Sequence, residues 1–583
     1  MSKGFVFRIG GAAGDGGSSS AENFARICVR SGLYTFTYTS YQSVIRGGHV
    51  WVQVRAAEDP VLSQGERPDL LLVLNQQTAD IHATQVRDGG AILMDEAIQV
   101  DAAKLATGVR VLRMPLAKIA TELGVQQLKN VVALSAAMAL LDMDVGLLEE
   151  AIRETWGTRK PKALEGNLEA MRRGTAWIAA NGGSMKLGIR FSGKRRLLMT
   201  GNNAIALGAV AAGCNFFAQY PMTPASSIMH WVASHALECG VVMKQAEDEL
   251  AAINMCIGAA HVGTRAMTAT SGGGFALMVE ALGEAGMTET PIVVALVARC
   301  GPSTGLPTKT EQGDLNMALG AGQGDWPRII IAPRNTVECF TESARSFNLA
   351  DLYQTPVILL SDLYLSEGFR TVEPDALDMN IPIVRGFLAD GAPPEGGYKR
   401  FKITDSGMSP RAFPGMKGFE YVAGTDEHTE DGELISDVRA GVPEFIEVRR
   451  KMHEKRMRKL RTAVKDMHGP EVWPEADAEY TILSWGSSQG PVREAVTRLR
   501  AEGASVNSME FRDLFPMPVA LVEKALAKVR ASLLVEGNYT GQFGRLLRAE
   551  TGFKPDFTYF KSDGEPFYPD ELVTKVKEVL VRA

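Results

Sequence analysis

The chain has 583 residues, about four times a typical domain of ~150 residues, so it is long enough for two to four domains with cores of their own. Hydrophobic residues at 45% and charged residues at 22% exclude a fibrous or mostly disordered protein. With 62 Lys and Arg against 68 Asp and Glu, the net charge of -6 argues against nucleic acid as a main partner. The N-terminus lacks the pattern of a signal peptide and no long apolar run follows it, so we expect a cytoplasmic protein.

The cysteines give no cluster or metal motif. No two are spaced as CxxC, and the nearest pair, Cys239 and Cys256, is seventeen positions apart. A zinc site or an iron–sulfur cluster on this chain is therefore not predicted. If the protein moves electrons, they leave through another chain.

The first block, residues 1 to 185, begins with a strand at 5–9, a glycine-rich turn and a helix at about 19–30. Further strands are expected at 50–54, 70–74, 91–94 and 109–112. Their continuous apolar character, with helices between them, predicts a parallel sheet covered on both faces.

The glycine-rich turn from Gly11 to Ser18 could hold a phosphate at the start of the helix. It departs from GxGxxG, so a nicotinamide or flavin, another phosphate-bearing ligand and a purely structural turn all stay open. Gly14 to Gly16 spell GDG, the opening of the magnesium and diphosphate motif of thiamine enzymes. The asparagine that closes that motif is absent from residues 28–48, so we expect no metal–diphosphate site on this chain.

Two more α/β blocks follow. Residues 198–385 repeat the alternation of strand and helix, and residues 476–583 form a smaller doubly wound block with strands at 480–485 and 532–535. Between them, residues 386–475 are rich in Gly, Pro and charge, as in an extended linker region. The basic run at 449–461 predicts a solvent-exposed helix.

The second block carries the clearest motifs. In Tyr220 to Ser227, two prolines fix the backbone on either side of Thr223 at the end of a strand, where open α/β sheets bind ligands; a structural turn is the alternative. The predicted apolar helix begins with Glu247, Asp248 and Glu249. Acidic residues in a first turn are stabilised by the helix dipole, so they need have no function. A carboxyl group drawn into apolar surroundings would have a raised pKa, which would make it a better proton donor.

A third motif begins at Arg299, directly after an apolar strand. A guanidinium in this position, followed by a loop of Gly, Pro, Ser and Thr that includes Thr308, suits a bidentate grip on a carboxylate.

Together these motifs are similar to those of one family. They read YPMTPASS, EDELAAINMCIGAAHVGTRAMTATSGGGFALMVE and RCGPSTGLPTKTEQGDL. They resemble the α subunits of the 2-oxoacid:ferredoxin oxidoreductases, thiamine-dependent enzymes that interconvert a 2-oxoacid and coenzyme A with an acyl-CoA and carbon dioxide. Residues 1–185 resemble the family's γ domain, fused in front, and WGSSQGPVREA and VEGNYTGQFGRL resemble its C-terminal domain.

The resemblance implies an α/β fold of three doubly wound domains: the γ domain, a pyrimidine-binding-type domain and a transketolase-like C-terminal domain. It also implies roles for individual residues. Glu249 would share a proton with a ring nitrogen of thiamine diphosphate, Arg299 would pair with the substrate's 1-carboxylate, and Thr223 would hydrogen-bond that carboxylate or the developing oxygen anion. Thr308 would add a polar contact.

In the γ-like block, residues 41–48 are similar to the family's SxxxRGG loop. Arg46 and Gly47 are therefore expected to approach the cofactor or the entry path of coenzyme A. A surface hairpin is the alternative.

The resemblance further implies partners and a substrate. A separate β subunit would carry the diphosphate and Mg²⁺ site and a [4Fe-4S] cluster, ferredoxin would take the electrons, and the assembly would be (αβ)2. The fused γ–α arrangement resembles the 2-oxoglutarate branch, which forms succinyl-CoA; pyruvate, branched or aryl 2-oxoacids and either reaction direction stay open. A rival from another class is a non-catalytic scaffold or nucleotide-binding electron-transfer subunit.

Overall fold

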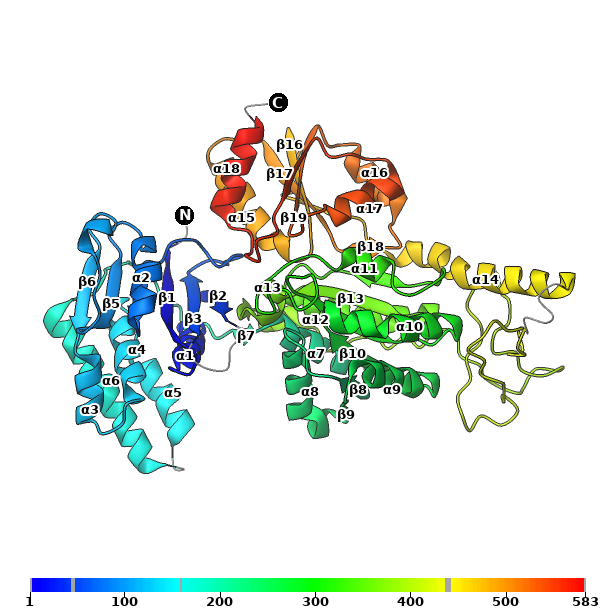
Figure 1. The fold of residues 1–583 in the computed structure, drawn as a ribbon, viewed down its shortest axis with the longest axis horizontal. Helices are drawn as coiled ribbons and strands as arrows, with labels where there is room; N and C mark the ends of the chain where they lie inside the picture. Colours follow the sequence, from blue (N-terminus) through cyan, green and yellow to red (C-terminus); the bar gives the residue numbers. More distant parts are fainter. Residues whose placement is uncertain (1–2, 43–47, 158–159, 436–441, 581–583) are drawn as a thin grey trace. The chain divides into compact units, whose positions relative to one another are not determined.

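The computed structural model describes residues 3–42, 48–157, 160–435 and 442–580. The chain divides into two compact units (Figure 1). The first holds the chain up to Thr200 with the short segments Glu367–Ala376 and Tyr568–Asp570, and the second holds the rest. Both are α/β, and the strands form three sheets.

The first unit contains an eight-stranded sheet in the order β6-β5-β4-β1-β3-β2-β14-β7. Its strands are β1 (Gly4–Ala12), β2 (Tyr34–Tyr41), β3 (His49–Ala57), β4 (Leu70–Val73), β5 (Ala91–Asp95), β6 (Arg110–Met114), β7 (Leu197–Met199) and β14 (Arg370–Val372). Its helices are α1 (Gly17–Arg30), α2 (Gln76–His82), α3 (Leu116–Glu122), α4 (Leu128–Leu140), α5 (Gly146–Trp156) and α6 (Pro161–Asn181).

The expectation of a wholly parallel sheet in this block is wrong. β3 pairs antiparallel with both β1 and β2, and β2 is a strand that the sequence analysis missed. β2 ends at Tyr41 and β3 begins at His49, a connection too short for the crossover that parallel neighbours need. Strands β1, β4, β5 and β6 are parallel. Helices α1 and α4 cover one face of this part of the sheet, in the main hydrophobic core, and α2 covers the other face.

The second unit contains a seven-stranded sheet in the order β18-β12-β13-β11-β10-β8-β9. Its strands are β8 (Phe216–Gln219), β9 (Val242–Gln245), β10 (Ala266–Thr270), β11 (Val293–Ala298), β12 (Ile329–Ile331), β13 (Val357–Asp362) and β18 (Asp513–Phe515). Its helices are α7 (Gly201–Ala211), α8 (Ser226–Cys239), α9 (Glu249–His261), α10 (Gly272–Met287), α11 (Leu315–Leu319), α12 (Thr336–Tyr353) and α13 (Leu363–Glu367). All neighbouring strands are parallel except β12 and β18.

The C-terminal domain adds a five-stranded sheet in the order β15-β17-β16-β19-β20. Its strands are β15 (Glu471–Trp473), β16 (Tyr480–Trp485), β17 (Val506–Phe511), β19 (Ala531–Glu536) and β20 (Phe557–Phe560), and its helices are α15 (Gln489–Ala501), α16 (Val519–Leu526), α17 (Gln542–Thr551) and α18 (Pro569–Leu580). This domain shares one hydrophobic core with the seven-stranded sheet, in which Ile330 and Leu360 cluster with Trp485 and Phe511.

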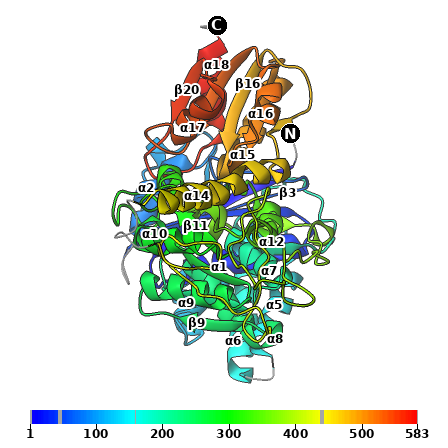
Figure 2. The same cartoon turned by 90° about the vertical axis from the view of Figure 1, so that its right-hand side faces the viewer.

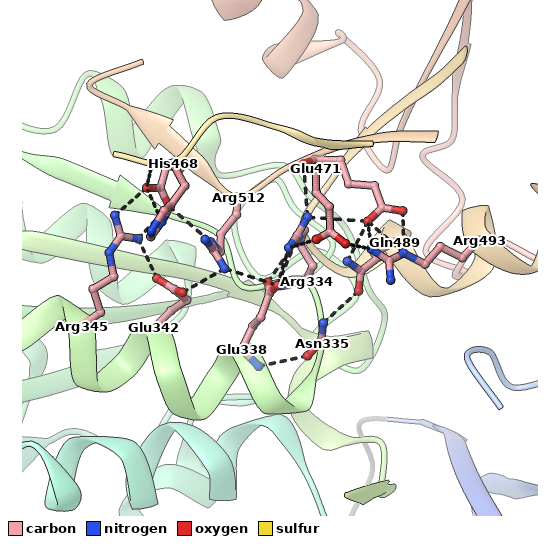
Figure 3. A network of polar contacts seen from close by, with 12 residues as sticks. Arg334, Asn335, Glu338, Glu342, Arg345, His468, Glu471, Gln489, Arg493 and Arg512 are labelled. Atoms are coloured by element: carbon pink, nitrogen blue, oxygen red, sulfur yellow. Dashed lines mark hydrogen bonds and ion pairs between the residues drawn. The ribbon is translucent and has the colours of Figure 1, made fainter. Parts of the chain in front are cut away.

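A network of charged side chains also joins the C-terminal domain to α12 (Figure 3). Arg334 pairs with Glu338 at 2.5 Å and with Glu471 at 2.6 Å. Farther along α12, Arg345 pairs with the buried Asp513 at 2.6 Å. The Arg334 guanidinium and the Asp513 carboxylate are buried, whereas the Glu471 side chain is 46% exposed. Removing a partner of either buried group is costly, because it weakens the compensation of a buried charge.

The basic helix expected to be exposed is α14 (Pro443–Ala463), the gold helix in Figures 1 and 2, and that expectation is wrong for part of it. Lys455 and Lys459 are fully buried, and both ammonium groups contact the carboxylate of Glu289, which precedes β11. Burial lowers the pKa of both lysines, and the Glu289 carboxylate opposes that effect. One face of the charged run therefore anchors the helix.

In the described parts of the chain, no helix combines the length and the apolar character needed to span a membrane.

We predict that Asp513→Asn destabilises the second unit. Burial alone would raise the pKa of Asp513, but hydrogen bonds from His468 and Arg345 hold it well below its usual value. The stabilisation is therefore complete above about pH 4 and fades as the pH falls further. At neutral pH the variant should lose about 3 kcal/mol, the low end for a broken buried pair, because Arg345 loses one of its two carboxylate partners and keeps Glu342.

Thermal and urea unfolding between pH 3 and pH 7 measure this loss, and the difference from the wild type should shrink at low pH. Glu447→Gln, which breaks an exposed pair with Arg450, is the control and should cost less than about 1 kcal/mol. Equal effects of the two substitutions would contradict the prediction.

Candidate active site

The predicted site residues follow β8, β9 and β11, three strands of the parallel part of the seven-stranded sheet. Thr223 follows β8, Glu249 comes shortly after β9, and Arg299 follows β11 directly. Because the carboxyl ends of parallel strands meet at one edge of a sheet, all three lie along the edge where such folds bind ligands.

Glu249 is the member of the acidic trio that the fold buries. Glu247 is exposed, and Asp248 caps α9 by accepting a hydrogen bond from the Ala251 N–H at 2.7 Å. Glu249 is only 3% exposed, and its Oε1 has no hydrogen-bond partner among the described residues. The three acids therefore differ: Glu247 lies at the surface, Asp248 caps the helix, and Glu249 is a buried carboxyl group with one oxygen that makes no described hydrogen bond.

The start of α10 leaves room for that carboxyl. A Cβ at Gly274 would lie 2.5 Å from Glu249 Oε1 and 2.1 Å from Thr270 Oγ1. At Gly272, a Cβ would lie 2.7 Å from Asp314 Oδ2. Both glycines are thus required by close approach, and they leave the first turn of α10 with bare backbone beside two carboxyl groups.

Arg299 and Thr223 lie side by side. The Arg299 Nη1 donates a hydrogen bond to the Thr223 carbonyl oxygen at 2.8 Å, which leaves the rest of the guanidinium fork for another acceptor. Both side chains are half-buried. Burial lowers the pKa of Arg299, and Asp314 acts against that shift. Thr308 is buried in the loop that follows Arg299.

Asp314 was not predicted as a site residue. Burial, helped by Glu311 and opposed by Arg299, raises the pKa of its carboxyl to about 6. Its Oδ2 has no hydrogen-bond partner among the described residues. The sequence signal was present, because Asp314 stands near the end of the motif that begins at Arg299.

Other buried polar groups at this edge are also unsatisfied within the described residues. They are Ser271 Oγ and both amide atoms of Gln219. Buried polar groups normally find partners, so unsatisfied ones gathered at one sheet edge indicate a place for a polar ligand or a partner protein.

The remaining predicted residues lie elsewhere. Arg46 and Gly47 fall outside the described residues. In the first unit, the glycine turn lines a cavity of about 270 Å³. Asp15 shapes this turn by accepting a hydrogen bond from the Ala12 N–H at 3.0 Å. Among the described residues, no group of three or more His, Cys, Asp and Glu side chains is arranged to hold a metal ion.

Comparison with known protein families accounts for most of the chain. Residues 6–177 match "Pyruvate ferredoxin/flavodoxin oxidoreductase", residues 207–444 match "Pyruvate flavodoxin/ferredoxin oxidoreductase, thiamine diP-bdg", and residues 478–553 match "Pyruvate:ferredoxin oxidoreductase core domain II". The unsatisfied sheet edge thus belongs to a thiamine diphosphate-binding domain.

Similar proteins extend over almost the full length. The α subunit of a 2-oxoacid:ferredoxin oxidoreductase from Sulfolobus is 33% identical over 98% of this chain and 96% of its own length. The 2-oxoglutarate oxidoreductase subunit KorA of Mycobacterium tuberculosis is 31% identical over 99% of this chain and 91% of its own length. The chain belongs to the 2-oxoacid:ferredoxin oxidoreductases, as an α subunit.

A solved structure supports the same assignment. The 2-oxoglutarate:ferredoxin oxidoreductase from Magnetococcus marinus, with 2-oxoglutarate, coenzyme A and succinyl-CoA bound, matches with a TM-score of 0.91 at 35% identity, over 99% of this chain and all of that one. The expected family and fold class are therefore confirmed.

We predict that Gly274→Ala lowers activity about 100-fold, because the added methyl group would lie 2.1 Å from Thr270 Oγ1 and 2.5 Å from Glu249 Oε1 and must displace the candidate site's carboxyl group by about 1 Å. The measurement is 2-oxoacid-dependent reduction of a viologen dye by the purified complex. Gly283→Ala, in the same helix with open space at its Cβ, is the control and should keep wild-type activity. Equal activities in both variants would overturn this account of Gly274.

Proposed function

We propose that this α subunit takes part in the reversible, coenzyme A-dependent oxidative decarboxylation of 2-oxoglutarate. The C1–C2 bond breaks and C1 leaves as carbon dioxide, while C2 forms a thioester with the sulfur of coenzyme A to give succinyl-CoA. Two electrons pass singly to ferredoxin. The observation that carries this proposal is that Thr223, Glu249 and Arg299 all follow strands ending at one sheet edge of a thiamine diphosphate-binding domain, where Arg299 contacts Thr223 and Glu249 is buried.

The choice of 2-oxoglutarate rests on relatives. The Magnetococcus marinus structure holds 2-oxoglutarate and succinyl-CoA, and it matches almost every residue of this chain at 35% identity. The KorA subunits of Mycobacterium tuberculosis and Methanothermobacter marburgensis, at 31% and 34% identity, are named for the same substrate.

The residues of the sheet edge fit thiamine diphosphate. The unpartnered Oε1 of the buried Glu249 suits a ring nitrogen, and Gly272 and Gly274 let the carboxyl groups of Asp314 and Glu249 lie against the backbone of α10. When bound, the cofactor supplies a carbon nucleophile for the 2-oxo group. Glu249 would hold a proton at Oε1 against the ring nitrogen and so orient the ring.

Arg299 and Thr223 would bind the substrate. The free part of the Arg299 guanidinium would bind the 1-carboxylate, and its hydrogen bond to the Thr223 carbonyl fixes its direction. The Thr223 hydroxyl would donate to the carboxylate or to the oxygen on which charge develops.

A β subunit would complete the site. We propose that it carries the diphosphate and Mg²⁺ site and a [4Fe-4S] cluster, and that the assembly is (αβ)2. The unsatisfied polar atoms at the sheet edge support a second chain on this side.

We predict that Glu249→Gln lowers 2-oxoacid-dependent dye reduction by about 10²–10⁴-fold, the usual contribution of a positioned acid or base. Gln keeps the shape of the side chain, so assembly with the co-expressed partner should be unchanged in gel filtration. Glu247→Gln, two residues earlier and exposed, is the matched control. Wild-type activity in Glu249→Gln would contradict the proposed role of Glu249 in the reaction.

We also predict that 2-oxoglutarate gives the highest kcat/KM in a panel with pyruvate and with branched and aryl 2-oxoacids, each with coenzyme A and a viologen dye. At least a tenfold preference over pyruvate is expected. A preference for pyruvate would overturn the substrate but not the reaction. Flavin absorbance in the isolated chain, with no activity on any 2-oxoacid, would instead support the nucleotide-binding electron-transfer subunit.

A further inference from the structure

The loop between Arg299 and α11 depends on the C-terminal domain for its position. We call this stretch, residues 299–314, the substrate loop. Its first part is held by hydrogen bonds within the loop, because the Cys300 N–H donates to the Lys309 oxygen and the Cys300 oxygen accepts from the Leu306 N–H. It contains no helix, and its only pairing of strand type is the single bridge between Cys300 and Leu306. A segment with so little regular structure has much conformational freedom to lose, so external contacts decide where it lies.

Gln312 makes four of those contacts. It is 4% exposed, and every hydrogen bond described for it joins it to the C-terminal domain. Its backbone N–H donates to the Gly537 oxygen at 2.6 Å, and its Oε1 accepts from the Gly537 N–H at 2.9 Å. Its Nε2 donates to the Trp485 oxygen at 2.9 Å, and its own carbonyl accepts from Asn538 at 3.2 Å.

Gln542 holds the end of the loop on both sides of Asp314. Its Nε2 donates to the Gly313 oxygen at 2.7 Å, and its Oε1 accepts from the Asn316 N–H at 2.8 Å. Asp314 and its buried carboxyl are therefore bracketed by two hydrogen bonds from one side chain at the start of α17.

A buried carboxylate fixes the turn that carries these contacts. Glu536 is fully buried and accepts hydrogen bonds from the Asn538 side chain at 2.9 Å and from the N–H groups of Phe543 and Gly544 at 2.9 and 2.8 Å. Asn538 Oδ1 in turn accepts from the Gln542 N–H at 3.2 Å.

Two glycines let the backbone of the C-terminal domain reach Gln312. A Cβ at Gly486 would lie 3.1 Å from its Nε2, and a Cβ at Gly537 would lie 3.3 Å from its Oε1. Gly486 and Gly537 belong to the segments WGSSQG and VEGNYTGQFG, for which the proposed reaction gives no other use.

We propose that Gln312 and Gln542 are positioning residues through which the C-terminal domain holds the substrate loop so that Arg299 can grip the 2-oxoacid carboxylate. This inference rests on the proposed function, because it takes Arg299 as the carboxylate-binding group. The C-terminal domain thereby acts on substrate binding without touching the substrate.

The test compares Gln312→Ala and Gln542→Ala with Gln489→Ala in the co-expressed complex. Gln489 is a matched control, because it is 5% exposed and also joins the C-terminal domain to the seven-stranded-sheet domain, through Asn335 at 2.9 Å (Figure 3). The hydrogen bonds described for its side chain go to Asn335 and Glu510, not to the substrate loop. If Gln312 and Gln542 only stabilise the contact between the two domains, their alanine variants should have the same KM and loop exchange as Gln489→Ala.

For Gln312→Ala and Gln542→Ala we expect the KM for 2-oxoglutarate to rise about tenfold with kcat within about threefold, since a weakened grip on the carboxylate removes uniform binding. Hydrogen–deuterium exchange in residues 301–314 should be faster in both variants. Gln489→Ala should change neither KM nor exchange in this loop, although its melting temperature should fall as much. Gln542→Glu keeps the acceptor for Asn316 and should restore part of the affinity.

Equal KM values and equal loop exchange in all three alanine variants would overturn the inference. Arg299→Ala separates this failure from failure of the proposed function. If Arg299→Ala abolishes 2-oxoglutarate turnover while the glutamine variants match Gln489→Ala, only the positioning role is wrong. If Arg299→Ala keeps full activity, the assignment of the carboxylate site is wrong, and the positioning proposal falls with it.

Discussion

The pairing of β18 with β12 is the constraint on which the second unit depends. It brings a strand of the C-terminal sequence into the sheet that carries the candidate site, and the two sheets then share one apolar core. Asp513 in β18 joins this edge to α12 through Arg345. Because backbone pairing, burial and charge all act at one seam, the C-terminal domain cannot shift without disturbing the sheet that positions Arg299.

The sheet edge of the candidate site differs from that seam, because several of its buried polar groups have no hydrogen-bond partner among the described residues. Glu249, Ser271 and Asp314 each keep a buried oxygen without a hydrogen-bond partner among the described residues, whereas the charges at the seam are matched. Unsatisfied buried groups cost stability, and such strain is commonly concentrated at functional sites. Unpartnered buried atoms also occur elsewhere in the described chain, for example at Asn202 and Ser484, but at this edge they follow the ends of parallel strands, where folds of this type bind ligands.

The sequence was sufficient for the parts of the fold governed by local pattern. Apolar strands followed by small or charged residues located the loops of Thr223 and Arg299, and the resemblance selected Glu249 among three acids. It was insufficient where a distant partner decides. Lys455 and Lys459 were predicted to be solvent-exposed, because the carboxylate that pairs with them, Glu289, is far away in sequence. Strand β2 was missed because its polar and aromatic residues do not form the apolar run of its neighbours, and Asp314 was passed over because only the folded loop places it beside Gly272.

The long-range contacts of the second unit also determine when its parts can fold during synthesis. Lys455 meets Glu289 across 166 residues, and Phe515 pairs with Ile330 from a still greater distance along the chain. Contacts of such high sequence separation form late, because closing the intervening chain must precede any gain from them. On the ribosome, the sheet that bears the candidate site stays without its edge strand, and Glu289 without its lysines, until most of the protein has been made. Until then, β12 presents an unpaired strand edge of the kind that can pair with other chains.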